Sequence, residues 1–327
     1  MDKPAVTIVV VPRDHFSDTK ESLESIYANS DTDFHLVYVD GNSPPSIARY
    51  LRTQAKARGF RLIRSQRYLS PNHARNLGAQ GVDTRYILFI DNDVVVAPNW
   101  LQPLVQCADE TGASVTGPLN FEGRPLHEKI HFSGGEAKVT ETQVNAQTER
   151  HIVDRIYKDN PRERRRTGCA EFHCMMVRTE DFRRVGGLDE RMLSTRENLD
   201  FCMSISAAGG SIYVEPRSRI TYLAPKEMHL SDIPYFALRW SDAWDLASFH
   251  HLRDKWRLEE DGYFHAQYRN LGWRRRGLMM CGGALRWLPS WRLRIGAEWL
   301  LRPLERRLNW IIAQRYAKRH GGEAFIR

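Results

Sequence analysis

The sequence predicts an α/β fold in which helices cover both faces of a mostly parallel sheet, followed by a C-terminal helical extension. Over about the first 215 residues, short apolar runs alternate with segments whose apolar residues recur at helical spacing, which is the pattern of repeated strand–helix units. Acidic or polar residues directly follow several of these runs, as at the carboxyl ends of parallel strands, where such sheets bind ligands. The chain contains no G-x-G-x-x-G or P-loop pattern, which argues against an ordinary dinucleotide site and a Walker-type ATPase.

The expected elements follow one another with short connections. Strands are expected at residues 6–11, 34–39, 61–64, 86–90, 113–116, 170–178 and 211–215. Helices are expected around residues 19–27, 47–55, 71–78, 100–105, 180–185 and 197–208. Asp18 and Glu21 have capping-box spacing, so Asp18 is expected to cap the first helix. Residues 120–166 lack either periodicity, and we interpret them as a flexible loop on the substrate side, with solvated surface as the alternative.

The strongest chemical signal is the tripeptide Asp91-Asn92-Asp93, which directly follows the fourth expected strand. Two unpaired carboxylates at the end of a buried strand repel each other and resist burial. A hard divalent cation such as Mn²⁺ or Mg²⁺ relieves both effects, and the phosphates of a substrate complete its coordination. An acidic turn is the alternative. Asp14 and Asp40 follow two other strands, so we expect all four acids to converge on one crevice.

A second pair of acids, Glu197 and Asp200, stands in the first turn of an expected helix. Three residues apart, they are expected to point to one face of that helix. A carboxylate there is able to accept a proton from a hydroxyl nucleophile. The helix dipole also favours acids in a first turn, which is the structural alternative.

Taken in order, these residues resemble the family 2 glycosyltransferases of the GT-A fold, whose sheet is Rossmann-like. The resemblance covers about residues 6–216 and rests on Pro12, residues 39–43, residues 74–78, Asp91 and Asp93, residues 186–190 and residues 197–200. It implies transfer of a sugar from a nucleotide-sugar, most commonly a UDP-sugar, to the hydroxyl of a glycan, lipid-linked or protein acceptor.

The resemblance also implies roles for individual residues. Asp91 and Asp93 would hold Mn²⁺ or Mg²⁺ against the diphosphate, and the ion would stabilise the departing nucleoside diphosphate. For the third metal ligand we consider His229, with an ordinary surface histidine as the alternative. The expected donor-site residues are Pro12, Asp14, Asp40 at the nucleobase, Arg75, Asn92 and His173.

The chain departs from the family pattern at Asn198. Inverting members usually carry Asp directly after the Glu, and that Asp is the base. We expect inversion with Glu197 as base and Asp200 as the other candidate, but Glu-Asn-Leu is also similar to retaining GT-A transferases, so the stereochemistry stays open. Two other functions are considered. One is a sugar nucleotidyltransferase, which normally has a Gly-rich loop that residues 12–15 lack. The other is an inactive sugar-binding or scaffold protein.

The chain is expected to divide into a catalytic domain at residues 1–234 and a helical region at residues 235–327. Residues 235–256 are rich in aromatic residues, which suit either sugar stacking or packing on the catalytic domain. Residues 271–327 hold thirteen Lys or Arg residues and three acids, a balance of +10 against +8 for the whole chain. The catalytic part is therefore near neutral, which argues against a nucleic-acid-binding core.

Tryptophan and arginine residues interleave over residues 271–316. Basic amphipathic helices with Trp lie in membrane interfaces and favour anionic lipids, so we expect two or three such segments, divided near Pro289 and Pro303, to contact a membrane. A protein interface is the alternative. No apolar run is long enough to span a bilayer, no signal-peptide pattern is present, and the five scattered cysteines suggest a reducing compartment. We therefore expect a cytoplasmic protein, peripheral on the cytoplasmic face of the inner membrane.

Overall fold

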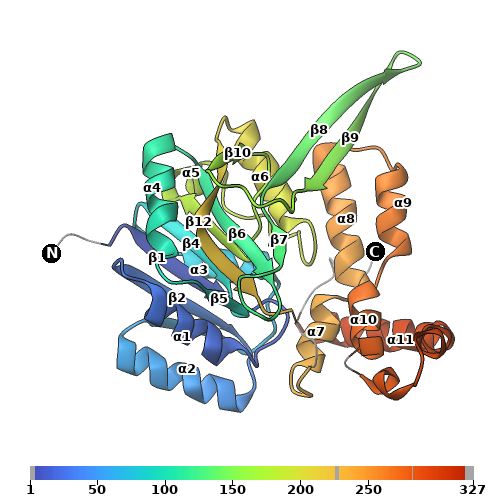
Figure 1. Cartoon of the computed structure of the whole chain (residues 1–327). Helices are drawn as coiled ribbons and strands as arrows, with labels where there is room; N and C mark the ends of the chain where they lie inside the picture. Colours follow the sequence, from blue (N-terminus) through green and yellow to red (C-terminus); the bar gives the residue numbers. More distant parts are fainter. Residues whose placement is uncertain (1–3, 225–227, 282, 321–327) are drawn as a thin grey trace.

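The computed structural model, which describes residues 4–224, 228–281 and 283–320, is built around one ten-stranded sheet (Figure 1). The sheet order is β10-β12-β6-β11-β4-β1-β2-β3, with β5 paired to β12 and β7 paired to β6. The strands are β1 (Val6–Val11), β2 (Phe34–Gly41), β3 (Arg61–Ser65), β4 (Tyr86–Asp91), β5 (Val94–Val96), β6 (Val115–Glu122), β7 (Ile130–Phe132), β10 (Arg165–Thr167), β11 (Cys174–Arg178) and β12 (Ile212–Tyr222). The predicted α/β class is confirmed.

The first four strands are parallel, and β11 is antiparallel to both β4 and β6. Alternate residues of these buried strands face two hydrophobic clusters. One cluster packs under α1 (Thr19–Asn29), α2 (Pro45–Arg58) and α4 (Leu101–Thr111). The other packs under α3 (Pro71–Ala79), α5 (Thr179–Arg184) and α6 (Glu197–Ala207). Helices therefore cover both faces, and the strand ends that carry the predicted acids meet at one edge.

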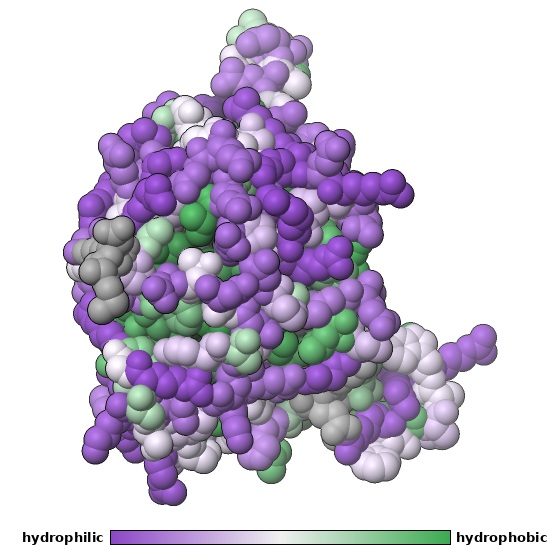
Figure 2. Space-filling model, turned by 60° about the vertical axis from the view of Figure 1, so that its left-hand side comes forward, coloured by the Kyte–Doolittle hydropathy of each residue, from purple (hydrophilic) through white to green (hydrophobic). Residues whose placement is uncertain are grey.

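The prediction of a loop over residues 120–166 is wrong. Residues 135–156 of this segment form a two-stranded hairpin, β8 (Gly135–Val144) and β9 (Gln147–Ile156), that projects from the body of the molecule (Figure 1). Its outer end is mostly hydrophilic, as the top of Figure 2 shows. The hairpin was hard to predict because its strands pair with each other and bury few side chains, with Ala137 and Ile152 as their members of the buried core cluster. Both turn residues, Asn145 and Ala146, have positive φ, the conformation that a tight hairpin turn requires.

Three other expectations differ from the structure. Helix α1 does begin at Thr19, but the carboxylate of Asp18 does not cap it and instead lies 2.7 Å from Nε2 of His15. The strand expected from residue 170 begins only at Cys174. The strand expected at residues 211–215 continues to Tyr222 through an irregularity after Glu215.

The C-terminal region is helical, as predicted. Its elements are α7 (Ile233–Arg239), α8 (Asp242–Trp256), α9 (Gly262–Arg269), α10 (Trp273–Cys281), the 3₁₀ helix η1 (Ala284–Trp287) and α11 (Trp291–His320). The predicted division at residues 234 and 235 falls within α7 and stays a prediction. Pro303 lies inside α11, so the expected break there is wrong. Proline has no N–H, so the carbonyl of Trp299 has no helical hydrogen-bond partner at Pro303. Both residues are exposed, and water is able to hydrogen-bond that carbonyl.

Candidate active site

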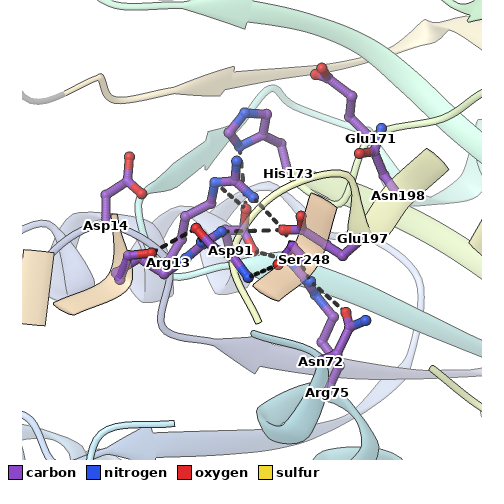
Figure 3. A network of polar contacts seen from close by, with 12 residues as sticks. Arg13, Asp14, Asn72, Arg75, Asp91, Glu171, His173, Glu197, Asn198 and Ser248 are labelled. Carbon is purple, nitrogen blue, oxygen red and sulfur yellow. Dashed lines mark hydrogen bonds and ion pairs between the residues drawn. The ribbon is translucent and has the colours of Figure 1, made fainter. Parts of the chain in front are cut away.

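A cluster of buried acids and arginines lies at the carboxyl end of β4 (Figure 3). Asp91, the last residue of the strand, accepts a hydrogen bond from Nη2 of Arg75 at 3.0 Å. Its other oxygen lies 3.4 Å from Nε of Arg13 and 3.3 Å from Nδ1 of His173. Burial alone would raise the pKa of Asp91, but Arg13, Arg75 and the His173 hydrogen bond outweigh it and lower that pKa to about 2. Asp91 is therefore an anion at neutral pH.

Asp93 is fully buried and differs sharply from Asp91. Neither carboxylate oxygen of Asp93 has a hydrogen-bond partner among the described residues, and the nearest cationic atom is Nδ1 of His15 at 3.8 Å. Burial raises the pKa of Asp93 well above its ordinary value; His15 opposes this effect, and the charges of Asp14 and Asp91 add to it. A buried carboxylate without a partner is costly, so this position calls for a cation.

His173, rather than His229, completes a group that suits such a cation. One ligand atom each from Asp91, Asp93 and His173 lie within 4.8 Å of one another. His131, Glu171 and His173 form a second group of this kind. Carboxylate oxygens with one imidazole nitrogen fit Mn²⁺, and the carboxylates also fit Mg²⁺. His229 is exposed, and its Nδ1 lies 2.7 Å from Oγ of Ser231, so the structure does not bring it to the acids.

Glu197, the first residue of α6, is held by three guanidinium groups. Its Oε1 lies 3.2 Å from Nη2 of Arg239, 3.5 Å from Nη1 of Arg13 and 3.9 Å from Nη1 of Arg75. Figure 3 shows Arg13 lying between Glu197 and Asp91. These contacts make the predicted acid part of the same network as the strand-end acids.

Asp200 does not share this site. Its carboxylate accepts hydrogen bonds from Nζ of Lys255 at 2.7 Å and from Nε1 of Trp256 at 2.8 Å, so it fastens α6 to α8. The expectation that both acids serve one face is therefore wrong. Residues three apart lie only about 60° apart around a helix, but the two carboxylates find partners from different neighbouring elements.

The turn into α6 is strained and well supported. Arg196, the N-cap residue, has a φ of 65°, a conformation that non-glycine residues rarely adopt. Its Nε donates a hydrogen bond to the hydroxyl of Tyr263 at 2.6 Å and lies 3.1 Å from Asp154 of the hairpin. The hairpin and α9 thus fix Arg196, the residue that directly precedes Glu197 and sets the start of α6.

Asn198 and Glu171 line a small cavity of about 80 Å³ together with Glu197 (Figure 3). Nδ2 of Asn198 donates to the carbonyl of Ala170 at 3.3 Å. Sequence reasoning missed Glu171 as a site residue, although its signal was present. Glu171 and His173 are the polar residues that interrupt an otherwise apolar run.

Asp14 is the predicted donor-site acid that the structure ties most firmly to the C-terminal region. Its carboxylate accepts hydrogen bonds from the hydroxyl of Tyr222 at 2.5 Å and from Nε1 of Trp240 at 2.9 Å. Burial opposes ionisation of Asp14, but Arg13 and Arg239 lead the effects that lower its pKa below the ordinary value. The partners come from more than 200 positions away, which is why spacing did not reveal them.

The remaining predicted donor-site residues make contacts within the protein. The buried carboxylate of Asp40 accepts from the Ser43 backbone N–H at 2.8 Å and pairs with Arg64. Asn92 accepts from the backbone N–H of Arg13 at 3.0 Å and donates to the carbonyl of His15 at 2.7 Å, which fixes the loop after β1. The carbonyl of Pro12 accepts from the hydroxyl of Tyr235.

A larger cavity of about 400 Å³ adjoins the cluster. Arg13, Asp14, His173 and Tyr222 line it from the sheet side. Trp240, Trp273 and Arg274 line it from the C-terminal region. The sequence did not predict that these C-terminal residues border the acids.

Comparisons with known proteins agree with this architecture. The family model described as glycosyl transferase family 2 matches residues 7–186. The chain is 26% identical over 197 residues to the succinoglycan biosynthesis protein ExoW of Rhizobium meliloti, covering 58% of this chain and 59% of ExoW. It is 24% identical over 218 residues to protein y4gI of Sinorhizobium fredii, covering 63% of this chain and 23% of y4gI. The chain thus spans less than two thirds of the curated relatives it matches.

Two solved structures share the fold. GalNAc-T7, determined with UDP, GalNAc and Mn²⁺, has a TM-score of 0.51 and 16% identity, covering 82% of this chain and 57% of GalNAc-T7. The mannosyltransferase PcManGT from Pyrobaculum calidifontis, in complex with GDP-Man and Mn²⁺, has a TM-score of 0.50 and 14% identity, covering 97% of this chain and 85% of PcManGT. The fold is therefore of the GT-A type, and since the family model matches more than half of its residues, the chain belongs to glycosyl transferase family 2.

Proposed function

We propose that this protein is a metal-dependent glycosyltransferase that moves a sugar from a nucleotide-sugar, with UDP-sugars the first choice, to an acceptor hydroxyl. The observation that carries the proposal is Asp93, a fully buried carboxylate without a described hydrogen-bond partner, beside Asp91 and His173. These three residues would hold Mn²⁺ or Mg²⁺. The ion would neutralise charge on the departing nucleoside diphosphate.

The remaining residues of the cluster supply orientation and charge. Arg75 orients Asp91 by a hydrogen bond within a fully buried pair. Arg13 lies between Asp91 and Glu197, where its positive charge would also stabilise a leaving diphosphate. Pro12, Asp14, Asp40 and Asn92 shape the donor side by fixing the loops after β1 and β2.

We propose Glu197 as the base and inversion as the outcome. Glu197 lines the small cavity with Asn198, where an acceptor hydroxyl is able to approach it. Asp200 is the weaker candidate because Lys255 and Trp256 occupy its carboxylate. A glycan, lipid-linked or protein acceptor fits this chemistry, and the similarity to ExoW supports testing glycans first.

The test is release of nucleoside diphosphate from a panel of UDP- and GDP-sugars, with and without Mn²⁺. Turnover that requires Mn²⁺ and is lost in Asp93→Ala supports the proposal. Donor binding without turnover under any condition would instead identify a sugar-binding or scaffold protein, the reading that Asn198 favours. Release of pyrophosphate from a nucleoside triphosphate and a sugar 1-phosphate would identify a nucleotidyltransferase.

We also propose that residues 271–316 contact a membrane surface. Helix α11 buries polar residues and exposes apolar ones. Two of its four buried residues are Glu298 and Asn309, while the side chains of Trp299 and Trp310 are 68% and 60% exposed. Glu298 is held inside by Arg276, and Asn309 by the carbonyl of Ala237. Among the described residues, no helix has both the length and the apolar character needed to cross a membrane.

Interleaved arginines make an anionic bilayer the fitting partner for this face. Such contact would place the enzyme on the cytoplasmic face of the inner membrane. Sedimentation with vesicles containing about one third anionic lipid is expected at low salt and is expected to weaken in Trp299→Ser/Trp310→Ser. Failure of the wild-type protein to sediment, together with a dimer in solution that the same substitutions dissociate, would assign the face to a second copy instead.

A further inference from the structure

Three consecutive arginines open α10, and the first of them differs from its neighbours. Arg275 pairs with Asp242 and Glu305, and Arg276 pairs with Glu298. Arg274 has no hydrogen bond or salt bridge within the described parts of the chain, but its guanidinium lies over two indole rings, 3.8 Å from the centroid of Trp240 and 4.5 Å from that of Trp273.

This stacking leaves the hydrogen-bonding capacity of Arg274 unused. A cation over an aromatic face is held by the ring quadrupole, whereas the five N–H donors of a guanidinium point outward in its own plane. Trp240 is buried and fixed by its hydrogen bond to Asp14, while Trp273 is 55% exposed. The result is a fixed cation with free donors beside one rigid indole and one accessible indole.

Arg274 stands where a ligand is able to reach it. It lines both the cavity of about 400 Å³ and the small cavity beside Glu197. Burial lowers the pKa of Arg274 to about 10 although Asp14 opposes that shift, so the cation has lost part of its hydration. The carboxylate of Asp14 is already engaged by Tyr222 and Trp240 and does not contact Arg274.

We propose that Arg274, Trp240 and Trp273 form an acceptor subsite that binds an anionic group, a phosphate or a carboxylate, carried by the sugar that receives the transferred residue. The guanidinium pairs with the anion in the bidentate manner that its fork geometry favours. The open face of Trp273 packs against the sugar ring. The inference rests on the proposed glycosyltransferase function.

The position of Arg274 favours the acceptor over the donor as the source of this anion. The donor diphosphate belongs, in the proposed function, at Asp91, Asp93 and His173. No described hydrogen bond, salt bridge or ring contact joins Arg274 to those residues, and Arg13 stands between, paired with Asp91 and 5.8 Å from the Trp240 ring centroid. The charges of Asp14 and Asp245 act on Arg274 without a salt bridge to it among the described residues, so its N–H donors are left for an anion of the acceptor.

The test is ligand binding to the full-length protein, followed by tryptophan fluorescence and by calorimetry. Glucose 6-phosphate, glucuronic acid and neutral methyl glucoside serve as probes, each titrated with and without saturating UDP and Mn²⁺. Both anionic probes are expected to bind at least about tenfold more tightly than the neutral one, in the presence of UDP as well as in its absence. A phosphate-only or carboxylate-only preference identifies which anion the subsite takes and still supports it.

Three variants complete the experiment. Arg274→Gln is expected to abolish the preference for anionic probes, and Arg274→Lys to retain part of it. Arg269→Gln, which removes the same charge from an exposed position of α9, is expected to change nothing. Thermal unfolding of each variant checks that the fold is intact.

Two outcomes would overturn the subsite. One is an unchanged anionic preference in Arg274→Gln, and the other is a loss of UDP affinity in that variant with probe binding unchanged, which would assign the cation to the donor. Failure of the proposed function is seen separately, as absence of turnover and of nucleotide binding in the wild-type protein. The probe titrations without nucleotide do not depend on it.

Discussion

Arg75 and Asp91 form an ion pair of 3.0 Å in which neither side chain has any exposed surface. The pair joins α3 to the end of β4, and the face of the guanidinium packs on the Phe172 ring at 4.0 Å. Breaking a buried pair by removing one partner leaves an uncompensated charge, which costs far more than the pair itself contributes.

Arg75→Leu is therefore expected to lower the free energy of unfolding by about 3–5 kcal/mol, measured by urea denaturation without metal. Arg85→Leu is the matched control, because Arg85 pairs with Asp109 at 3.2 Å on the surface. Exposed pairs contribute about 1 kcal/mol or less. Equal losses in the two variants would mean that the Arg75–Asp91 pair does not organise the site.

Mn²⁺ is expected to stabilise the wild-type protein by mass action, by about 2.7 kcal/mol at one hundred times its dissociation constant. Asp93→Asn is expected to lose this gain. Without metal, the same variant is expected to be as stable as the wild type or more so, because it removes a buried carboxylate without a partner. Thermal unfolding with and without Mn²⁺ measures both effects.

The contrary pattern, a variant that is destabilised without metal yet still responds to Mn²⁺, would show that Asp93 has a structural partner and that the ion binds elsewhere. Asp109→Asn, an exposed position, controls for the loss of one negative charge.

Glu197→Gln and Asp200→Asn are expected to separate catalysis from folding. Loss of a general base slows the chemical step by about 10²–10⁴-fold, so Glu197→Gln is expected to lower kcat by that factor with little effect on donor KM. Asp200→Asn is expected to leave kcat within about threefold and to lower stability by about 1–3 kcal/mol, because it weakens two part-buried contacts to α8. Reversal of these two results would move the base to Asp200.

Asp189 provides a pH-dependent link between the segment before α6 and α8. Hydrogen bonds from His251 at 2.8 Å and Lys255 at 3.1 Å lower the pKa of Asp189 below its ordinary value, the His251 bond most strongly and against a smaller opposing effect of burial. Because the folded-state pKa is depressed, the stabilisation is fully present above the unfolded-state pKa of about 3.9 and is lost as the pH falls further, through the folded-state value.

Asp189→Asn is expected to cost about 1 kcal/mol at pH 6, a value reduced for partial exposure of the pair. The difference from the wild type is expected to shrink below about pH 4. Urea denaturation from pH 3 to pH 7 measures it, and a difference that grows on acidification would contradict the assigned direction.

The sequence predicted those parts of the fold and site that local pattern encodes. The run ending at Asp91 is apolar because β4 is buried on both faces, and the strand–helix alternation follows from core packing on two sides. The hairpin β8–β9 was not predicted, because its strands pair only with each other and bury few side chains. Its turn residue Ala146 is also not one that signals a positive φ.

The residues that complete the site could not be predicted from local sequence patterns, because they come from distant parts of the chain. Arg239 contacts Glu197 across 42 positions and Trp240 contacts Asp14 across 226. The sequence places Trp240 in an aromatic-rich segment, but nothing local to either position shows that Arg239 or Trp240 faces these acids. Conversely, the spacing of Glu197 and Asp200 did not distinguish their roles. Their partners do, because Glu197 contacts arginines and Asp200 contacts α8.

The two hydrogen bonds to Asp14 depend on residues that are translated much later than Asp14 itself. A ribosome delivers Asp14 at the start of translation but Tyr222 and Trp240 only after about two thirds of the chain. Domains generally fold as units, and β12, which ends at Tyr222, belongs to the sheet, so the sheet is complete only once the first donor of Asp14 has been made. A product released between residues 222 and 240 would therefore contain every strand of the sheet but lack the indole that donates to Asp14.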